Sequence, residues 1–116
     1  MAVATKMNTG RTVVVISSLD ADYNYSTDFA AYTNGVRVQS IQYLPSGLND
    51  KCVIKDYNGS VLVSPEVFYV SSQCKFATKY FDGRRMKPYY DVSDSNNTCA
   101  ASANAKIIIN LDDIVR

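Results

Sequence analysis

Short segments of apolar and alternating residues run along this chain, and turn-forming residues separate them. Residues 11–18 have a continuous apolar centre, which predicts a strand buried on both faces. Residues 36–44 predict another strand, and the shift of their apolar phase midway predicts a β-bulge. The apolar runs at residues 67–70 and 106–111 predict two further buried strands. About seven to nine strands at this spacing predict a sandwich, a jelly roll or a small barrel.

The clearest local signal is Asn58-Gly59, the preferred pair for a two-residue type I′ hairpin turn. It lies between two segments of strand character, residues 51–57 and 60–63. Pairing these segments across the turn would give one apolar face and one mixed face, as a sandwich requires. The apolar face would hold Cys52, Ile54, Val61 and Val63.

A second candidate hairpin turn, Asp82-Gly83, follows the alternating segment of residues 74–81. Pro88 should limit the next strand to a sheet edge or to an early stop, because proline cannot donate a hydrogen bond to the ladder. Residues 91–104 are polar and predict a loop. No segment requires a helix longer than a turn or two.

Residues 20–35 are polar, contain several tyrosines and end in a turn signal at Asn34-Gly35. Their apolar pattern is the weakest in the chain, so we expect Tyr23, Tyr25 and Tyr32 to lie outside the core. Tyrosine is enriched at interfaces because it offers a large contact area and a polar tip at small entropic cost. These three tyrosines are therefore candidate interface residues.

The composition also favours an all-β domain. Val, Ile and Thr together number 27, against five Leu and one Glu, and ten of the 11 acidic residues are Asp, which favours turns over helix interiors. A chain of 116 residues has room for one core. We expect a single β-sandwich, jelly-roll-like or barrel domain over residues 11–116, preceded by an N-terminal arm over residues 1–10.

The arm has Val3 and Met7 as its only sizeable apolar residues, too few to dock on its own domain. We therefore expect a neighbouring chain to supply the missing surface. The N-terminus lacks a signal-peptide pattern, and no apolar run approaches the ~18 residues that cross a bilayer. These observations predict use in a cytosol, or export inside an assembly, with no membrane partner.

The chain has no histidine, which excludes Ser-His-Asp and Cys-His catalysis and histidine metal ligands. Its three cysteines, Cys52, Cys74 and Cys99, cannot complete a zinc site of the usual Cys-and-His kind. We interpret them as small buried hydrophobes, with one disulfide between two strands as the alternative. We expect no enzyme activity, no metal and no cofactor; a carboxylate-based enzyme is the alternative.

Residues 91–96, Asp-Val-Ser-Asp-Ser-Asn, place oxygen atoms at alternate positions, as some calcium loops do. They lack the glycine and the distant Glu of an EF-hand. We favour a solvated turn in which the Asp and Ser side chains satisfy the local backbone.

Basic residues cluster between positions 75 and 87, with Tyr80 and two later tyrosines interleaved. One interpretation is a solvated strand face on which lysine protects a sheet edge, and the other is a contact with an acidic protein surface. We do not expect nucleic acid as a partner, because the whole chain carries a formal charge of only +1. The candidate interface residues of this cluster are Lys75, Lys79, Arg84, Arg85, Lys87, Tyr89 and Tyr90.

Several segments between residues 36 and 111 resemble small β-rich virion proteins of tailed bacteriophages. They are Val36-Arg37-Val38, Ile41-Gln42-Tyr43-Leu44-Pro45-Ser46, Val53-Ile54-Lys55-Asp56, Tyr80-Phe81-Asp82-Gly83, Lys87-Pro88-Tyr89 and Ala105-Lys106-Ile107-Ile108-Ile109. The resemblance is to capsid decoration (cement) proteins and other small β-rich components of the particle.

This resemblance implies a structural virion protein, made in the host cytoplasm, that stabilises the particle by protein–protein contacts and without a cofactor. Its partner would be the major capsid protein or another virion protein, and it would form a homo-oligomer such as a trimer. The alternative function is a receptor- or carbohydrate-binding β-sandwich module, as in a phage tail or on a cell surface, whose tyrosines stack on sugar.

Overall fold

The computed structural model describes residues 4–8 (backbone only), 12–17, 19, 21–45, 51–70, 77–98 and 105–112. They form nine β-strands and one short 3₁₀ helix, and no helix in these ranges could span a membrane. The elements are β1 (Ala4–Asn8), β2 (Thr12–Ile16), β3 (Tyr23–Asn24), η1 (Tyr25–Thr27), β4 (Val36–Leu44), β5 (Cys52–Asp56), β6 (Glu66–Val70), β7 (Ala77–Met86), β8 (Pro88–Tyr90) and β9 (Lys106–Leu111).

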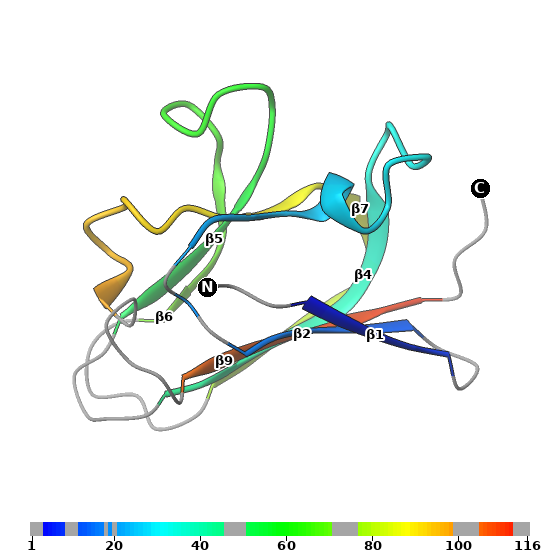
Figure 1. Cartoon of the computed structure of the whole chain (residues 1–116), viewed down its shortest axis with the longest axis horizontal. Helices are drawn as coiled ribbons and strands as arrows, with labels where there is room; N and C mark the ends of the chain where they lie inside the picture. Colours follow the sequence, from blue (N-terminus) through cyan, green and yellow to red (C-terminus); the bar gives the residue numbers. More distant parts are fainter. Residues whose placement is uncertain are drawn as a thin grey trace.

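The strands form two antiparallel sheets, which confirms the predicted all-β sandwich-like fold (Figure 1). The larger sheet has the strand order β1-β2-β9-β4-β7, and the smaller has the order β3-β8-β5-β6. Strand β9, which is last in sequence, lies at the centre of the larger sheet between β2 and β4. The predicted strands at residues 11–18, 36–44, 67–70 and 106–111 are all present within a few residues of their expected bounds.

The core lies between the sheets, and β4 shows how the sequence pattern builds it. Along β4 the buried side chains are those of Val36, Val38, Ser40, Ile41 and Tyr43. The alternation changes phase after Ser40 because the register shifts between Val38 and Ser40 against both neighbouring strands. The β-bulge predicted from the apolar phase is therefore confirmed.

The N-terminal segment differs from the expected free arm. Residues 4–8 form β1, which pairs with β2 from Ala4 opposite Ile16 to Asn8 opposite Thr12. Backbone hydrogen bonds are enough to add such an edge strand, so few apolar side chains are needed. The expectation that this segment does not dock on its own domain is therefore wrong for residues 4–8.

The hairpin predicted with a two-residue turn at Asn58-Gly59 has a different form. Strand β5 pairs with β6, so residues 57–65 form a loop instead of a two-residue turn. Gly59 has a positive φ of 100°, but Asn58 does not share the positive φ that a type I′ turn requires. Val63, predicted to lie on the apolar face, is 70% exposed.

The pair Asp82-Gly83 lies inside β7 rather than at a hairpin turn. Both residues have positive φ values, 52° and 82°, as the sequence signal suggests. They lie between Tyr80 and Arg84, where the register between β7 and β4 shifts. Strand β7 remains paired with β4 on both sides of this point, so the chain does not turn back. The left-handed backbone conformation is thus used as a bulge.

Pro88 is the first residue of the three-residue strand β8, which lies between β3 and β5. The strand is short, as expected, and the first position of a strand tolerates proline.

Three tyrosines expected at an interface are core residues. Tyr23 and Tyr25 are 5% and 6% exposed, and Tyr90 is fully buried. Their hydroxyl groups donate to Asp28 Oδ2 at 3.0 Å and to the carbonyls of Tyr32 at 2.9 Å and Leu19 at 2.9 Å, respectively. Each ring can therefore be buried without leaving its hydroxyl unsatisfied. Burial raises the pKa of both Tyr23 and Tyr25.

Candidate functional site

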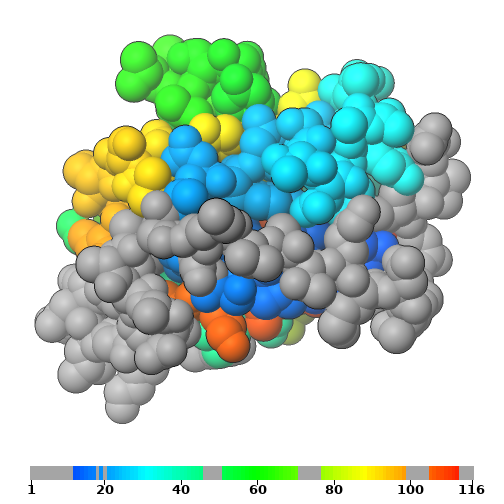
Figure 2. All heavy atoms as spheres, viewed as in Figure 1, coloured from blue at the N-terminus to red at the C-terminus, as the bar shows by residue number. Residues whose placement is uncertain are grey.

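The loop of residues 57–65, between β5 and β6, stands out from the body of the domain and forms a knob on its surface (Figures 1 and 2). Its tip carries two apolar side chains: Leu62 is 92% exposed and Val63 is 70% exposed. Single exposed apolar residues are common on protein surfaces. Two adjacent ones at the end of a projecting loop form a convex apolar contact point.

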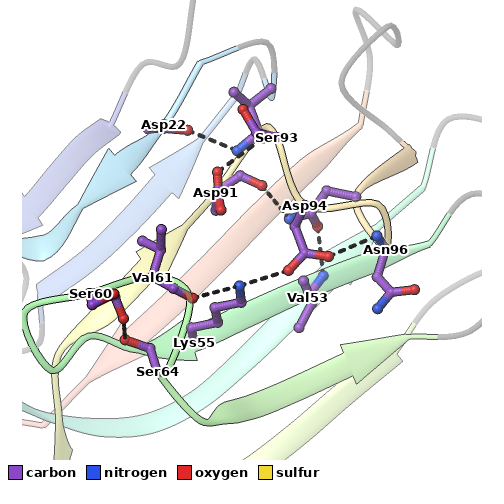
Figure 3. Close-up of polar contacts among 12 residues, drawn as sticks. Asp22, Val53, Lys55, Ser60, Val61, Ser64, Asp91, Ser93, Asp94 and Asn96 are labelled. Carbon is purple, nitrogen blue, oxygen red and sulfur yellow. Dashed lines mark hydrogen bonds and ion pairs between the residues drawn. The ribbon is translucent and has the colours of Figure 1, made fainter.

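Hydrogen bonds inside the loop hold this tip in place. The Asn58 side chain accepts from Ser60 N at 3.3 Å and from Ser64 Oγ at 2.9 Å, and donates to Val63 O at 3.2 Å. Ser64 Oγ also lies 2.7 Å from Ser60 O (Figure 3) and accepts from Asn58 N at 3.1 Å. These side-chain hydrogen bonds stabilise the loop in place of backbone hydrogen bonds between strands, and they preorganise it for contact.

Lys55 connects the loop to the next surface segment. Its Nζ atom donates to Val61 O at 3.0 Å and forms an ion pair with Asp94 Oδ2 at 2.8 Å (Figure 3). The two side chains are only 11% and 15% exposed. The hydrogen bond from Lys55 lowers the pKa of the Asp94 carboxyl below its ordinary value.

Residues 91–98 form the polar loop to which Asp94 belongs. Asp91 Oδ1 accepts from Ser93 N at 3.0 Å and Asp94 Oδ1 accepts from Asn96 N at 2.8 Å, which are Asx turns (Figure 3). The buried Asn97 joins this loop to β5, since it accepts from Val53 N at 2.7 Å. The interpretation of residues 91–96 as a turn is confirmed for the two Asp side chains, which accept from the local backbone. Within the described ranges, no three acidic, Cys or His side chains gather to hold a metal.

The Lys55–Asp94 pair leads to a pH prediction. Asp94→Asn should lower the free energy of unfolding by about 1–2 kcal/mol at pH 7, between the values for exposed and buried pairs. The folded-state pKa of Asp94 is lowered, so its contribution is full above the unfolded value of about 4 and is lost as the pH falls through the folded value. Urea unfolding of the wild type and of Asp94→Asn from pH 7 to pH 2.5 measures their difference in unfolding free energy. This difference should shrink below about pH 4. A difference independent of pH would contradict this assignment.

A notch of about 360 Å³ opens between the 57–65 loop and the turn at Asn34. Figure 2 shows the hollow between the projecting loop and the segment around residues 30–35, with part of the β7–β8 region between them. The lining includes Asn34, Asp56, Tyr57, Asn58, Arg85 and Lys87. These residues come from three separate segments of the chain, so the notch exists only in the folded domain.

The walls of the notch are fixed by backbone contacts. Asp56 Oδ1 accepts from Lys87 N at 2.8 Å, and Tyr57 N donates to Lys87 O at 2.9 Å. Arg85 Nη1 donates to Gly35 O at 3.1 Å. The Tyr57 ring stacks on Tyr89 with a centroid separation of 5.0 Å and an angle of 18°.

Tyr89, one of the predicted interface residues, is half-buried behind Tyr57, and its hydroxyl donates to Asp22 Oδ2 at 3.1 Å. Burial, followed by the nearby Asp22 carboxylate, raises its pKa to about 12. The phenol therefore stays protonated at neutral pH. Tyr89 supports the notch from behind rather than lining it.

The basic cluster is divided by the fold. Strand β7 is an edge strand, and Lys79, Arg84 and Arg85 are exposed along it. Lys79 Nζ donates to Val67 O of β6 at 3.0 Å and lies 5.3 Å from the centre of the Phe81 ring. This agrees with the interpretation that lysine protects a sheet edge.

The remaining predicted interface residues have different outcomes. Tyr32 is partly buried and packs edge-to-face on Phe29, with a centroid separation of 5.9 Å, so it is not a surface platform. Val3, Lys75 and the side chain of Met7 lie outside the described residues. Among the cysteines, Cys52 is fully buried, as expected, and Cys74 and Cys99 lie outside the described residues.

The surface roles of Leu62, Val63 and the lining residues Asn34, Asp56 and Tyr57 were not predicted from the sequence. Residues 60–63 have the composition of a strand, so the sequence predicted a strand where the structure has a projecting loop. The signal that could have identified them is the pair of short polar residues, Asn58 and Ser64, that flank the apolar run and can bond its backbone.

Comparison with protein families, curated proteins and solved structures finds no match for this chain. The functional information in this structure therefore lies in the chemistry of this surface. Its two distinct parts are the apolar tip of the 57–65 loop and the polar notch beside it.

Proposed function

We propose that this chain is a structural virion protein of the capsid decoration type, which acts by protein–protein contact. The observation that carries this proposal is the exposure of Leu62 and Val63 at the tip of a hydrogen-bonded loop. A rigid convex tip loses little conformational entropy when it enters a socket on a partner. The virion assignment is supported by the resemblance of residues 36–111 to small β-rich phage proteins.

The energetics suit a subunit present in many copies. Complete burial of a Leu or Val side chain contributes about 1.5–3 kcal/mol, so one tip gives a weak contact. Repetition over a symmetric particle, or within a homo-oligomer, would turn weak contacts into firm attachment. The partner would be the major capsid protein or another virion protein.

The double variant Leu62→Ser/Val63→Ser tests this function. It should reduce binding to capsid shells of the virus that encodes the chain by about 10-fold or more, because two buried apolar side chains are lost at the contact. Cosedimentation with shells measures binding, and analytical ultracentrifugation measures self-association. The free energy of unfolding should change by less than about 0.5 kcal/mol, since both residues are exposed.

Tyr69→Ser is the matched control, because Tyr69 is 49% exposed on β6, outside the loop. It should leave shell binding and self-association unchanged. A wild-type chain that stays monomeric and does not sediment with shells would overturn the proposed function. Equal losses in the tip variant and the control would overturn the role of the tip.

The second candidate function is a carbohydrate-binding module. The observation that favours it is the notch, which has an aromatic ring and several polar groups in one hollow.

A further inference from the structure

The notch has the parts of a small-ligand site, beginning with its aromatic wall. Tyr89 stacks on the Tyr57 ring at 5.0 Å, and Tyr57 also lines the hollow. A ring fixed in this way offers a flat apolar surface at little entropic cost. The C–H face of a pyranose packs against such a ring, and its hydroxyl groups remain free for polar neighbours.

The polar groups around Tyr57 come in both charges. Asp56 uses one carboxylate oxygen for Lys87 N, which leaves the other able to accept from a hydroxyl group. Arg85 uses Nη1 for Gly35 O, which leaves the rest of its fork of donors available. Lys87 bonds Asp56 and Tyr57 through its backbone N and O, which leaves its Nζ atom available to a ligand. The charged lining, Arg85, Lys87 and Asp56, sums to +1.

We propose that this notch binds a sugar residue that bears a carboxylate, such as a uronic or sialic acid. The carboxylate pairs with Arg85 and Lys87, the ring packs on Tyr57, and a hydroxyl group donates to Asp56. Guanidinium–carboxylate pairs are among the strongest and most directional hydrogen-bonded contacts in proteins. The volume of about 360 Å³ is at the low end of the range for small-ligand pockets, which suits a single sugar residue.

The lining also distinguishes a carboxylate from a phosphate. A phosphate monoester carries about −1.5 to −2 charges at neutral pH, so the Asp56 carboxylate within the same notch repels it more strongly than it repels a singly charged carboxylate. A sugar carboxylate carries a single charge, equal and opposite to that of the charged lining. Asp56 favours a ligand rich in hydroxyl donors, which a sugar is.

The site is independent of the proposed contact through Leu62 and Val63. The notch is open, so we expect a dissociation constant of about 1 mM for one sugar residue. Multiple copies of the chain would raise the effective affinity for a polysaccharide or a glycan-coated surface.

The experiment is a titration of the full ¹⁵N-labelled chain, followed by amide chemical shifts. The probes are methyl β-D-glucuronide, the methyl glycoside of N-acetylneuraminic acid, the neutral methyl β-D-glucoside, and adenosine monophosphate. One or both acidic sugars should shift the amide signals of Tyr57 and Lys87 and bind about 10-fold or more tightly than the glucoside. The proposal is overturned if neither acid shifts these signals, if the glucoside binds equally well, or if the nucleotide binds more tightly than both acids.

Variants assign the contacts. Lys87→Gln should weaken binding of the acidic sugar about 5–10-fold and bring its affinity close to that of the neutral glucoside. Tyr57→Leu should weaken both sugars, whereas Tyr57→Phe, which keeps the ring, should retain most of the binding. Unchanged binding in both Lys87→Gln and Tyr57→Leu would overturn the proposed site.

Lys106→Gln is the matched charge control. Lys106 is exposed at the start of β9 and pairs with Leu44, at the far end of β4 from Val36 and the notch. It should leave sugar binding unchanged; a loss equal to that of Lys87→Gln would mean that only net charge matters and would overturn the proposal. Leu62→Ser/Val63→Ser should also retain sugar binding, so the notch and the loop tip can fail separately.

Discussion

Tyr90→Ala is expected to lower the free energy of unfolding by about 4 kcal/mol, and Tyr90→Phe by about 1 kcal/mol. Tyr90 is fully buried on β8, and its hydroxyl donates to the carbonyl of Leu19 at 2.9 Å. Alanine removes the ring and leaves a cavity between the sheets, whereas phenylalanine removes only the hydroxyl group and its hydrogen bond. Urea unfolding monitored by circular dichroism measures both values.

The same pair of variants tests the contrary assignment of Tyr90 to an interface. An exposed contact residue would change the stability of the isolated domain by no more than about 0.5 kcal/mol in either variant. Two small values would therefore show that the ring is not part of the core.

Gly35→Ala is expected to lower the free energy of unfolding by about 3 kcal/mol or more. Gly35 has a φ of 95°, which an L residue rarely adopts, and an added Cβ would lie 2.6 Å from the backbone oxygen of Met86. The backbone of β7 cannot move aside without disturbing its pairing with β4. Thermal and urea unfolding should both show the loss.

Gly59→Ala provides the matched comparison. Gly59 has a similar φ of 100°, but an added Cβ there meets nothing within 4 Å. Gly59→Ala should lower the free energy of unfolding by about 1 kcal/mol, which is the conformational strain of a positive φ alone. Equal costs at the two glycines would show that the approach to Met86 contributes nothing.

The strands with a clear apolar run or alternation were predictable from the sequence, although β2 does not bury both faces as expected, since Val13 and Val15 are only partly buried. Their side chains obey the period of two, and the bulge in β4 was visible because it changes the phase of that period. Strand β9 was found from its run of isoleucines, Ile107 to Ile109, although only alternate residues of the strand are buried.

The hairpins were not predictable because the turn signals report backbone conformation and not strand pairing. Gly59, Asp82 and Gly83 do adopt positive φ values. At Asn58, side-chain hydrogen bonds to Ser60, Ser64 and Val63 stabilise a wider loop in place of the tight turn. Residues with positive φ can form either a hairpin turn or a bulge. Which of the two they form depends on the strand that pairs with them, and the local sequence does not specify that strand.

The site was poorly predicted for a related reason. Tyr23 and Tyr25 lie in and beside a two-residue strand and a 3₁₀ turn, where neither helical nor strand periodicity applies, so burial left no pattern in the sequence. The reverse error arose at residues 60–63, whose apolar character suggested a strand. The composition drew attention to the tyrosines. It could not separate core tyrosines from surface ones, because that depends on contacts between segments distant in sequence.

The central place of β9 in the larger sheet has a consequence for biosynthesis. A ribosome makes β1, β2, β4 and β7 before it makes β9, yet β2 and β4 meet only through β9. Until residue 111 has left the exit tunnel, the nascent chain has an incomplete sheet with apolar edges at β2 and β4. Such edges are prone to pair with other chains, and contacts between segments distant in sequence form slowly. The larger sheet should therefore close late, once β9 has emerged, and nascent copies close together on one messenger RNA would depend on chaperones to remain apart until then.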